Sequence, residues 1–290
     1  MPATAKVKGP AAAGGFVVQA PAIAPHVLAQ LARQAGARAI VPAGFGTPEA
    51  WRFPDVAGDD ALVTAAHAAG CDAAFVPVDR RLADVSVVAM DMDSTLITIE
   101  CIDEIADMKG IRPEVAAITE AAMRGEIDFA QSLTRRVALL AGLPVEALER
   151  VYAERLRISD GAARMLARFR AAGATTALVS GGFTFFTDRL QATLPLDVAV
   201  ANSLEIDAGR LTGRIAGPIV DGQVKADTLR ALKAKCGGGL AVAIGDGAND
   251  LPMFAAADVA IAWRAKPVVR AQAACTLDVC GLDGALNYFA

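Results

Sequence analysis

The chain has 290 residues, a length that suits two domains, and 54% of them are hydrophobic. Lysine and arginine total 28 against 32 aspartate and glutamate residues, which gives a formal net charge of −4. No basic block stands out, so nucleic acid and anionic membranes are not expected partners. No run of about 18 apolar residues predicts a transmembrane helix.

The first residues and the cysteines bear on where the protein resides. Residues 1–15, MPATAKVKGPAAAGG, contain two lysines but no apolar segment of the signal-peptide type, so we expect a flexible tail. The five cysteines include no CxxC pair and are odd in number. That pattern is typical of reduced thiols rather than of a disulfide framework, and it predicts a cytoplasmic protein.

Residues 16–84 have the pattern of a small α+β domain. The segments FVVQA, ARAIVPA and CDAAFVPV predict three strands. PHVLAQLARQAG has helical spacing and ends at a glycine, and an alanine-rich helix is expected between the second and third strands.

From residue 85 onwards, short β-branched runs alternate with helical patterns, which predicts a parallel sheet covered on both faces. The runs are VSVVAM, TTALVS (175–180), LAVAIG (240–245) and DVAIA (258–262). Residues 100–158 are almost wholly helical in pattern and too long for one crossover. We therefore predict a doubly wound α/β core of residues 85–290 with a helical cap inserted at about 100–158. Residues 202–217 predict a β-hairpin that turns at Asp207-Ala208-Gly209.

The segment DMDST places Asp91 and Asp93 directly after an apolar strand pattern. If the backbone stays extended there, the two carboxylates point the same way and repel, so a cation or a shared proton must relieve them. Oxygen ligands favour Mg²⁺, and an aspartate can also attack phosphorus. A surface turn with a capping aspartate is the competing interpretation, and the apolar strand before it weakens that alternative.

Two other predicted strands also end in polar or glycine residues. GDGAND supplies Asp246 and Asp250 at a strand-to-helix junction, where Asn249 can cap the helix. An ordinary capped turn is the alternative, whereas an EF-hand lacks its downstream glutamate. SGG, which contains Ser180, precedes a helical pattern and could seat a phosphate.

Ligands bind beyond the carboxyl ends of strands in an open parallel sheet, so DMDST, SGG and GDGAND are expected to converge on one crevice. Lys225 could reach a phosphate there, although taken alone it fits a solvated surface lysine better. The absence of GxxxxGK excludes a P-loop NTPase. Only two histidines occur, both far in sequence from the acidic cluster, which argues against a Ser-His-Asp triad or a histidine-rich zinc site.

DMDST, SGG, a lone lysine and GDGAND, in this order, resemble the haloacid dehalogenase superfamily of Mg²⁺-dependent phosphotransferases. Glu100 and the cap segment MRGEIDFAQSLTRRVALL (123–140) narrow the resemblance to its phosphoserine phosphatases. The resemblance covers about residues 85–285. It implies Mg²⁺-dependent hydrolysis of O-phospho-L-serine through an aspartyl-phosphate.

The resemblance also implies roles for individual residues. Asp91 would be the nucleophile and Asp93 the general acid and base, and Asp91, Asp93 (through its carbonyl), Asp246 and Asp250 would form the metal site. The residues expected to bind the substrate are Glu100, Met123, Phe129, Arg136, Ser180, Gly181, Lys225 and Asn249. Of these, Glu100 would pair the ammonium group and Arg136 the carboxylate, while Met123 and Phe129 would close an apolar lid.

Two alternative functions remain open, as does the role of the N-terminal domain. Another small phosphomonoester, such as phosphohomoserine or phosphothreonine, could be the substrate. The chain could also be a catalytically inactive regulator that binds an amino acid. Phosphoserine phosphatases often carry an ACT-like domain, and residues 16–84 are compatible with a shortened one. This domain could bind serine, pack against the rest of the chain or form a homodimer.

Overall fold

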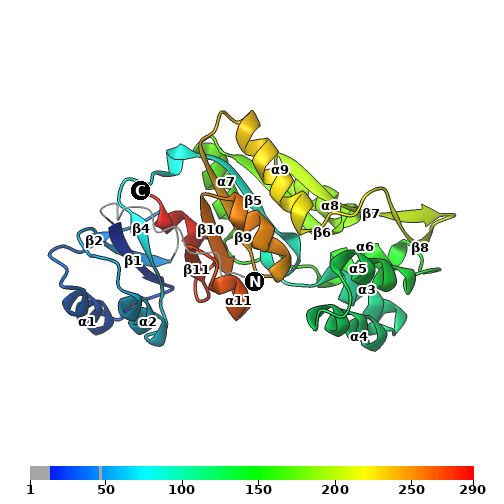
Figure 1. Cartoon of the computed structure of the whole chain (residues 1–290), viewed down its shortest axis with the longest axis horizontal. Helices are drawn as coiled ribbons and strands as arrows, with labels where there is room; N and C mark the ends of the chain where they lie inside the picture. Colours follow the sequence, from blue (N-terminus) through cyan, green and yellow to red (C-terminus); the bar gives the residue numbers. More distant parts are fainter. Residues whose placement is uncertain (1–13, 46–47) are drawn as a thin grey trace.

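The computed structural model describes residues 14–45 and 48–290. Most of the predicted tail, residues 1–13, lies outside the described residues. Its last two residues, Gly14 and Gly15, instead begin the first strand. Figure 1 shows a small sheet with two helices at one end, a large sheet in the middle and a group of helices at the other end.

The N-terminal part of the described chain forms a four-stranded antiparallel sheet in the order β2-β3-β1-β4. Its strands are β1 (Gly14–Ala20), β2 (Val41–Pro42), β3 (Glu49–Phe53) and β4 (Asp72–Pro77), and its helices are α1 (Pro25–Ala35) and α2 (Asp60–Ala68). The prediction of a strand over ARAIVPA was too long, because Pro42 offers no N–H and the strand is a short edge. Strand β3 was not predicted.

The central sheet has the order β11-β10-β9-β5-β6-β7-β8 among the described residues, and its neighbours pair in parallel except β7 and β8. Its strands are β5 (Val85–Met90), β6 (Thr175–Phe183), β7 (Val198–Asp207), β8 (Arg210–Ala216), β9 (Leu240–Gly245), β10 (Val259–Trp263) and β11 (Cys275–Leu277). Apart from Asp258, the residues of the four predicted runs all lie in strands of this sheet, which confirms the α/β prediction.

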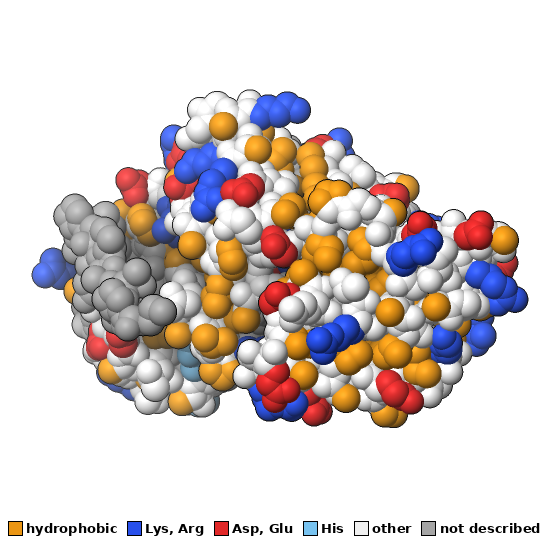
Figure 2. Space-filling view, turned by 45° about the vertical axis from the view of Figure 1, so that its right-hand side comes forward, with side chains coloured by type: hydrophobic (Ala, Val, Ile, Leu, Met, Phe, Trp, Pro, Cys, Tyr) orange, Lys and Arg blue, Asp and Glu red, His pale blue; other side chains and the backbone are white. Residues whose placement is uncertain are grey.

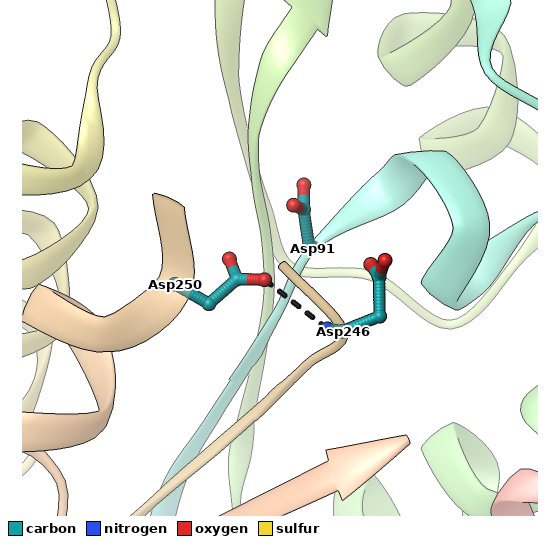
Figure 3. A group of neighbouring side chains, drawn as sticks. All are labelled: Asp91, Asp246 and Asp250. Atoms are coloured by element: carbon teal, nitrogen blue, oxygen red, sulfur yellow. Dashed lines mark hydrogen bonds between the residues drawn. The ribbon is translucent and has the colours of Figure 1, made fainter. Parts of the chain in front are cut away.

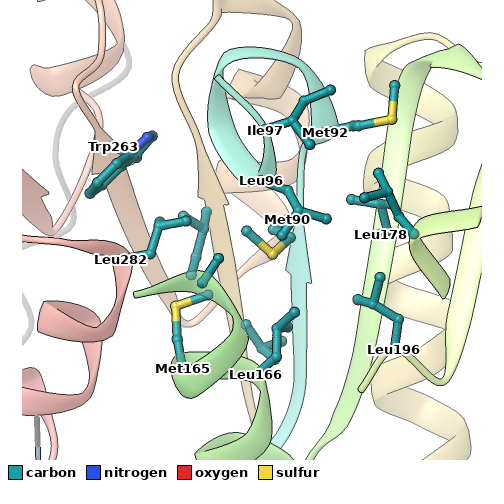
Figure 4. Packing of buried hydrophobic residues seen from close by; sticks show 14 of the residues in the cluster. Met90, Met92, Leu96, Ile97, Met165, Leu166, Leu178, Leu196, Trp263 and Leu282 are labelled. Atoms are coloured by element: carbon teal, nitrogen blue, oxygen red, sulfur yellow. The ribbon is translucent and has the colours of Figure 1, made fainter. Parts of the chain in front are cut away.

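Helices cover both faces of the central sheet, as expected. They are α7 (Ala162–Ala171), α8 (Thr184–Thr193), α9 (Gly222–Lys235), α10 (Leu251–Ala256) and α11 (Pro267–Arg270), and the short helical turns are η1 (Leu82–Asp84), η2 (Met92–Leu96), η3 (Val151–Arg155), η4 (Ala248–Asp250) and η5 (Leu282–Tyr288). Side chains of β5 alternate between the two layers. Val88 and Met90 pack in the cluster that contains Leu166 of α7, whereas Val87 and Ala89 pack with Leu229 of α9. Figure 4 shows Met90, Leu166 and Leu178 side by side in the first of these layers.

The segment between β5 and β6 is helical, as predicted for the cap. It contains α3 (Cys101–Lys109), α4 (Arg112–Met123), α5 (Phe129–Ala138) and α6 (Glu146–Arg150). The predicted hairpin is formed by β7 and β8, and Ala208 and Gly209 take positive φ values of 45° and 75° in its turn. The hairpin reaches across to the cap, where the Leu211 N–H donates to the Leu143 carbonyl at 2.9 Å and the Gly142 N–H donates to the Leu211 carbonyl at 2.8 Å.

No helix in the described part of the chain is both long and apolar enough to span a bilayer. Figure 2 shows one face of the molecule, on which acidic and basic side chains are interspersed rather than gathered in one patch.

The N-terminal sheet is joined to the C-terminal segment through the buried side chain of Asp72. Its carboxylate accepts backbone N–H groups of Asp278 at 2.7 Å, Val279 at 3.1 Å and Cys280 at 2.8 Å. Arg52 adds hydrogen bonds from its Nη2 to the carbonyls of Asn287 and Phe289. These contacts join strands near the start of the chain to residues near its end.

We expect Asp72→Ala to lower the free energy of unfolding by on the order of 3 kcal/mol, because several backbone donors lose a charged acceptor in a buried place. Urea denaturation measures this effect. Asp55→Ala, at an exposed position of the same sheet region, is the matched control and should change stability by less than about 0.5 kcal/mol. Equal stability of the two variants would contradict the role given to Asp72.

Candidate active site

Three adjacent strands of the central sheet, β9, β5 and β6, end at one cavity of about 560 Å³. Asp91 follows β5, Ser180 lies near the end of β6, and Asp246 follows β9. The cap helices α3, α4 and α5 form the opposite wall. The prediction that DMDST, SGG and GDGAND converge on one crevice is therefore confirmed.

Asp91 lies at the floor of this cavity with only 4% of its surface exposed. Its Oδ1 accepts the N–H of Met92 at 2.7 Å, and its Oδ2 accepts Nδ2 of Asn249 at 3.0 Å and lies 2.6 Å from Nζ of Lys225. Asp91 and Asp93 have extended backbone angles, but Met92 between them lies in the helical turn η2, so the chain is not extended throughout residues 91–93 as expected from the sequence. Asp91 and Asp93 nevertheless line the same cavity, whereas Met92 is buried in the core.

Asp93 and Glu100 face each other across the entrance to α3. The Asp93 Oδ1 accepts the N–H of Cys101 at 3.0 Å, and the Ser94 hydroxyl donates to Glu100 Oε1 at 2.7 Å. Burial raises the pKa of Asp93 well above its usual value, and the nearby Glu100 carboxylate adds to the effect. Desolvation, together with the charges of Asp246 and Asp91, also raises the pKa of Glu100.

Asp91, Asp246 and Asp250 form a group in which one carboxylate oxygen from each residue lies within 4.8 Å of the other two (Figure 3). Thr95 Oγ1 donates to Asp246 Oδ1 at 2.9 Å. Asp250 Oδ2 accepts the N–H groups of Asp246 and Gly247 at 3.2 and 3.1 Å. Burial raises the pKa of Asp246, as does the nearby Asp91 carboxylate. Crowded, partly buried carboxylates with oxygen donors only fit a hard divalent cation.

Lys225 lies in the first turn of α9 and is 1% exposed, so the interpretation as a surface lysine is wrong. Its Nζ lies 2.6 Å from Asp91 Oδ2 and 2.8 Å from Asp250 Oδ1. Burial alone would lower the pKa of Lys225, but the two carboxylates outweigh it and raise the pKa. The lysine is therefore a fixed positive charge beside Asp91. The prediction that Asn249 caps a helix was also wrong, because its amide points at Asp91.

The SGG segment is constrained by close packing. The Ser180 hydroxyl is fully buried and accepts the N–H of Gly182 at 2.9 Å. A Cβ on Gly182 would lie 2.6 Å from Cε of Met92 and 2.7 Å from Oδ2 of Asp93, and one on Gly181 would lie 2.8 Å from Cζ of Phe129. A side chain at either position would have to displace these groups, whereas glycine lets the backbone approach a ligand held between Asp91 and the cap.

The cap wall carries the other residues that the sequence singled out. Phe129, Arg136 and Met123 all line the cavity, although Met123 is 68% exposed and covers little of it. Arg136 Nε is buried without a hydrogen-bond partner among the described residues, and so is Oγ of Ser132 one turn earlier on α5. Burial lowers the pKa of Arg136, and Asp103 and Glu100 oppose that effect. An unpaired buried guanidinium nitrogen in a cavity wall fits an anionic group of a ligand.

Four further residues of this region were not singled out from the sequence. Ser132 and Lys266 line the cavity, Thr95 bonds to Asp246, and Asn202 bonds to the backbone of the SGG segment. Thr95 belongs to DMDST and Ser132 lies between Phe129 and Arg136 on one helix face, so their places in known motifs were available signals. No local pattern marked Asn202 or Lys266.

Comparisons with known proteins agree with this geometry. A family model described as haloacid dehalogenase-like hydrolase matches residues 88–255, more than half of the chain. The phosphoserine phosphatase of Polaromonas sp. is 50% identical over 216 residues, which cover 72% of this chain and 92% of that protein. A crystal structure of a probable phosphoserine phosphatase from Vibrio cholerae, in unliganded form, matches with a TM-score of 0.82 and 37% identity, covering 95% of this chain and 86% of that one.

A further solved structure, a substrate-bound phosphoserine phosphatase complex, has a TM-score of 0.66 and 36% identity, and covers 71% of this chain and 99% of that one. The residues that the family model matches include the segments that carry the acidic cluster, the SGG turn and the buried lysine. The chain belongs to the haloacid dehalogenase-like hydrolase family.

Proposed function

We propose that this protein is a phosphoserine phosphatase, which hydrolyses O-phospho-L-serine to L-serine and phosphate in the last step of serine biosynthesis. One observation carries the proposal: a single cavity holds the acidic cluster of Asp91 on one side and both Glu100 and the unpaired Nε of Arg136 on the other. With a divalent cation on the acidic cluster and Lys225 beside Asp91, the phosphate, the ammonium group and the carboxylate of phosphoserine would each meet a complementary charge. The relatives named phosphoserine phosphatase support the same substrate.

In the proposed reaction, an Asp91 carboxylate oxygen attacks phosphorus and the bond from phosphorus to the serine oxygen breaks. Asp93 gives its proton to that leaving oxygen, a role that suits a carboxyl group whose pKa is raised. In the second step Asp93 accepts a proton from water as the water oxygen attacks phosphorus, and the bond to Asp91 breaks. Free phosphate and the starting carboxylates result.

The donor set around Asp91 fits Mg²⁺. Asp91, the Asp93 backbone carbonyl and Asp246 would hold the ion, and Asp250, whose oxygens already accept three hydrogen bonds, would orient this group. A bound Mg²⁺ would neutralise charge on the phosphoryl oxygens.

The chain's own donors would hold the phosphoryl group. We assign this part to the Ser180 hydroxyl, the Gly181 N–H, the Lys225 ammonium group and the Asn249 amide. Phosphoryl transfer spreads negative charge over three equatorial oxygens, so fixed donors and a fixed cation stabilise the transition state. Lys225 is already held beside Asp91, which means that little reorganisation is needed.

The cap would select the rest of the substrate. Glu100 would pair the ammonium group and Arg136 the carboxylate, each as a charge-assisted hydrogen bond. Phe129 packs against Gly181 and shields the phosphate side from water. Met123 would join it as a lid only after moving inward, because its side chain is now exposed.

A panel of phosphomonoesters tests the substrate directly. Phosphate release should be measured from L-phosphoserine, phosphothreonine, phosphohomoserine, a sugar phosphate and an aryl phosphate, with Mg²⁺ and with EDTA. We expect a strong preference for L-phosphoserine in the presence of Mg²⁺, and loss of this activity with EDTA. Preference for phosphothreonine or phosphohomoserine would move the substrate within the same chemistry. No turnover of any substrate, together with serine binding, would identify an inactive regulator.

Arg136→Ala is expected to lower kcat/KM for L-phosphoserine by roughly 10- to 100-fold, because a charged hydrogen bond to the carboxylate is lost. An aryl phosphate has no carboxylate, so its turnover should change little. Arg135→Ala, at the exposed neighbouring position on α5, is the control and should leave both substrates unaffected. Equal losses on the two substrates would contradict the assignment of Arg136.

We also propose that residues 16–84 are an ACT-like domain, that the protein is cytoplasmic, and that it forms a homodimer. The antiparallel sheet with two helices supports the first proposal, and five free thiols fit the second. Size-exclusion chromatography with light scattering tests the dimer, and calorimetry with serine tests ligand binding by the domain.

A further inference from the structure

Asn202, on β7, is 1% exposed, and its side-chain amide both donates and accepts hydrogen bonds. Its Nδ2 donates to the Gly181 carbonyl at 2.8 Å and to the Gly182 carbonyl at 3.3 Å. Its Oδ1 accepts the N–H of Val220 at 2.8 Å. One buried amide therefore joins the SGG segment of β6 to the residues that precede α9.

The two contacts to SGG fix the orientation of its peptide planes. Each carbonyl that Asn202 holds belongs to the same planar peptide as the next N–H. Holding the Gly181 carbonyl therefore orients the Gly182 N–H, which donates to the Ser180 hydroxyl. Glycine residues have wide backbone freedom, so the contact limits how the Gly182 N–H can turn. It thereby fixes the position of the Ser180 hydroxyl, one of the donors assigned to the phosphoryl group.

The contact to Val220 fixes the start of the helix that carries the lysine. Asp221, the next residue, caps α9 by accepting the N–H of Val224 at 2.9 Å, and its carbonyl accepts the N–H of Lys225 at 3.0 Å. The position of Val220 therefore sets the first turn of α9. That turn places the Lys225 Nζ against Asp91.

We propose that Asn202 is a positioning residue that aligns the two phosphate-binding segments, SGG and the start of α9, with each other. The inference rests on the proposed phosphatase function. Asn202 touches no reacting atom; it acts through Gly181, Ser180 and Lys225. Its effect falls on the phosphoryl group, so every phosphomonoester is affected alike, in contrast with Arg136.

Two variants separate the halves of the contact. Asn202→Asp keeps an oxygen for the Val220 N–H but turns a carboxylate oxygen towards the two glycine carbonyls, whereas Asn202→Ala removes everything. We expect both to lower kcat/KM by roughly 10- to 100-fold, equally for L-phosphoserine and an aryl phosphate, because displacement of aligned groups is costly. Ser203→Ala is the control: it lies next along β7 and its hydroxyl meets only that of Thr184 among the described residues.

Inorganic phosphate provides a readout that a structural role alone would not change. Its inhibition constant should rise about tenfold in the Asn202 variants, while the Mg²⁺ concentration for half-maximal activity stays at the wild-type value. Circular dichroism and the melting temperature show whether each variant is folded. Phosphate protection of the melting temperature reports the same binding without turnover.

Several results would overturn the inference. They are a folded Asn202→Asp variant with unchanged phosphate inhibition and kcat/KM, a loss confined to L-phosphoserine, and failure of both variants to fold, which would make Asn202 a residue of the fold alone. A wild-type protein without preference for L-phosphoserine would refute the substrate assignment only. The comparison of phosphate binding between wild type and the variants would still decide the role of Asn202.

Discussion

Asp91→Asn abolishes turnover, with an expected loss of at least about 10⁴-fold in kcat, because an amide cannot form the aspartyl-phosphate. The fold should survive, since the amide has the same shape and Lys225 keeps its contact with Asp250. Phosphate release measures the loss, and labelled phosphoserine with acid quenching measures the covalent intermediate, which should be absent.

Asp93→Asn is the companion variant that tests the division of labour between the two aspartates. An aryl phosphate has a leaving group that needs no proton, so this variant should still become phosphorylated by it, and the phosphoenzyme should accumulate because no base activates water. With L-phosphoserine it should be inactive in both steps. Turnover retained by Asp91→Asn would refute the nucleophile assignment.

Lys225→Met is expected to cost about 3–5 kcal/mol in the free energy of unfolding without metal, because it leaves Asp91 and Asp250 buried without their shared cation. Activity should fall by roughly 10²- to 10³-fold, since a charge beside the phosphoryl group is lost. Saturating Mg²⁺ should restore part of the stability but little of the activity. Denaturation with Mg²⁺ and with EDTA measures the stability, and phosphate release measures the activity.

Lys233→Met is the matched control on the same helix. Lys233 pairs with Asp258 at 2.7 Å, but its side chain is 31% exposed, so the pair contributes at most about 1 kcal/mol. Its removal should leave catalysis unchanged and show no dependence on Mg²⁺. If Lys225→Met were no less stable than Lys233→Met, the buried pair would not have the importance given to it here.

The convergence of the three motifs could be predicted because it follows from local patterns. Short apolar runs predict parallel strands, and parallel strands present their carboxyl ends at one edge. The positions of Asp91, Ser180 and Asp246 in the site could be predicted from this pattern alone. The burial of Lys225 could not be predicted in the same way. It results from the packing of α9 over β5 and β6, which lie far from Lys225 in the sequence.

The wrong and missing predictions also result from contacts between segments that are far apart in the sequence. The strand EAWRF was not predicted because Arg52 interrupts its apolar pattern, yet Arg52 is buried by hydrogen bonds to Asn287 and Phe289 at the other end of the chain. Asn249 was expected to cap a helix from its position, and the proximity of Asp91 gives its amide another partner. Asn202 carries no motif, and its role depends on three strand and helix ends that meet only in the folded chain.

The hairpin of β7 and β8 bears on the rates at which ligands enter and leave the cavity. In the described residues the cap is linked to the core by its two connecting segments, which pair at Ile97 and Ile158, and also by the hairpin's hydrogen bonds to Gly142 and Leu143. Gly213 lets the hairpin lie so close that a Cβ there would be 2.9 Å from the Ala141 side chain. A hinge motion of the cap must therefore carry the hairpin along or break these bonds. If the bonds break, amide exchange at Gly142 reports the opening of the cavity. If the hairpin moves with the cap, the bending stiffness of this edge hairpin sets how readily the cavity opens.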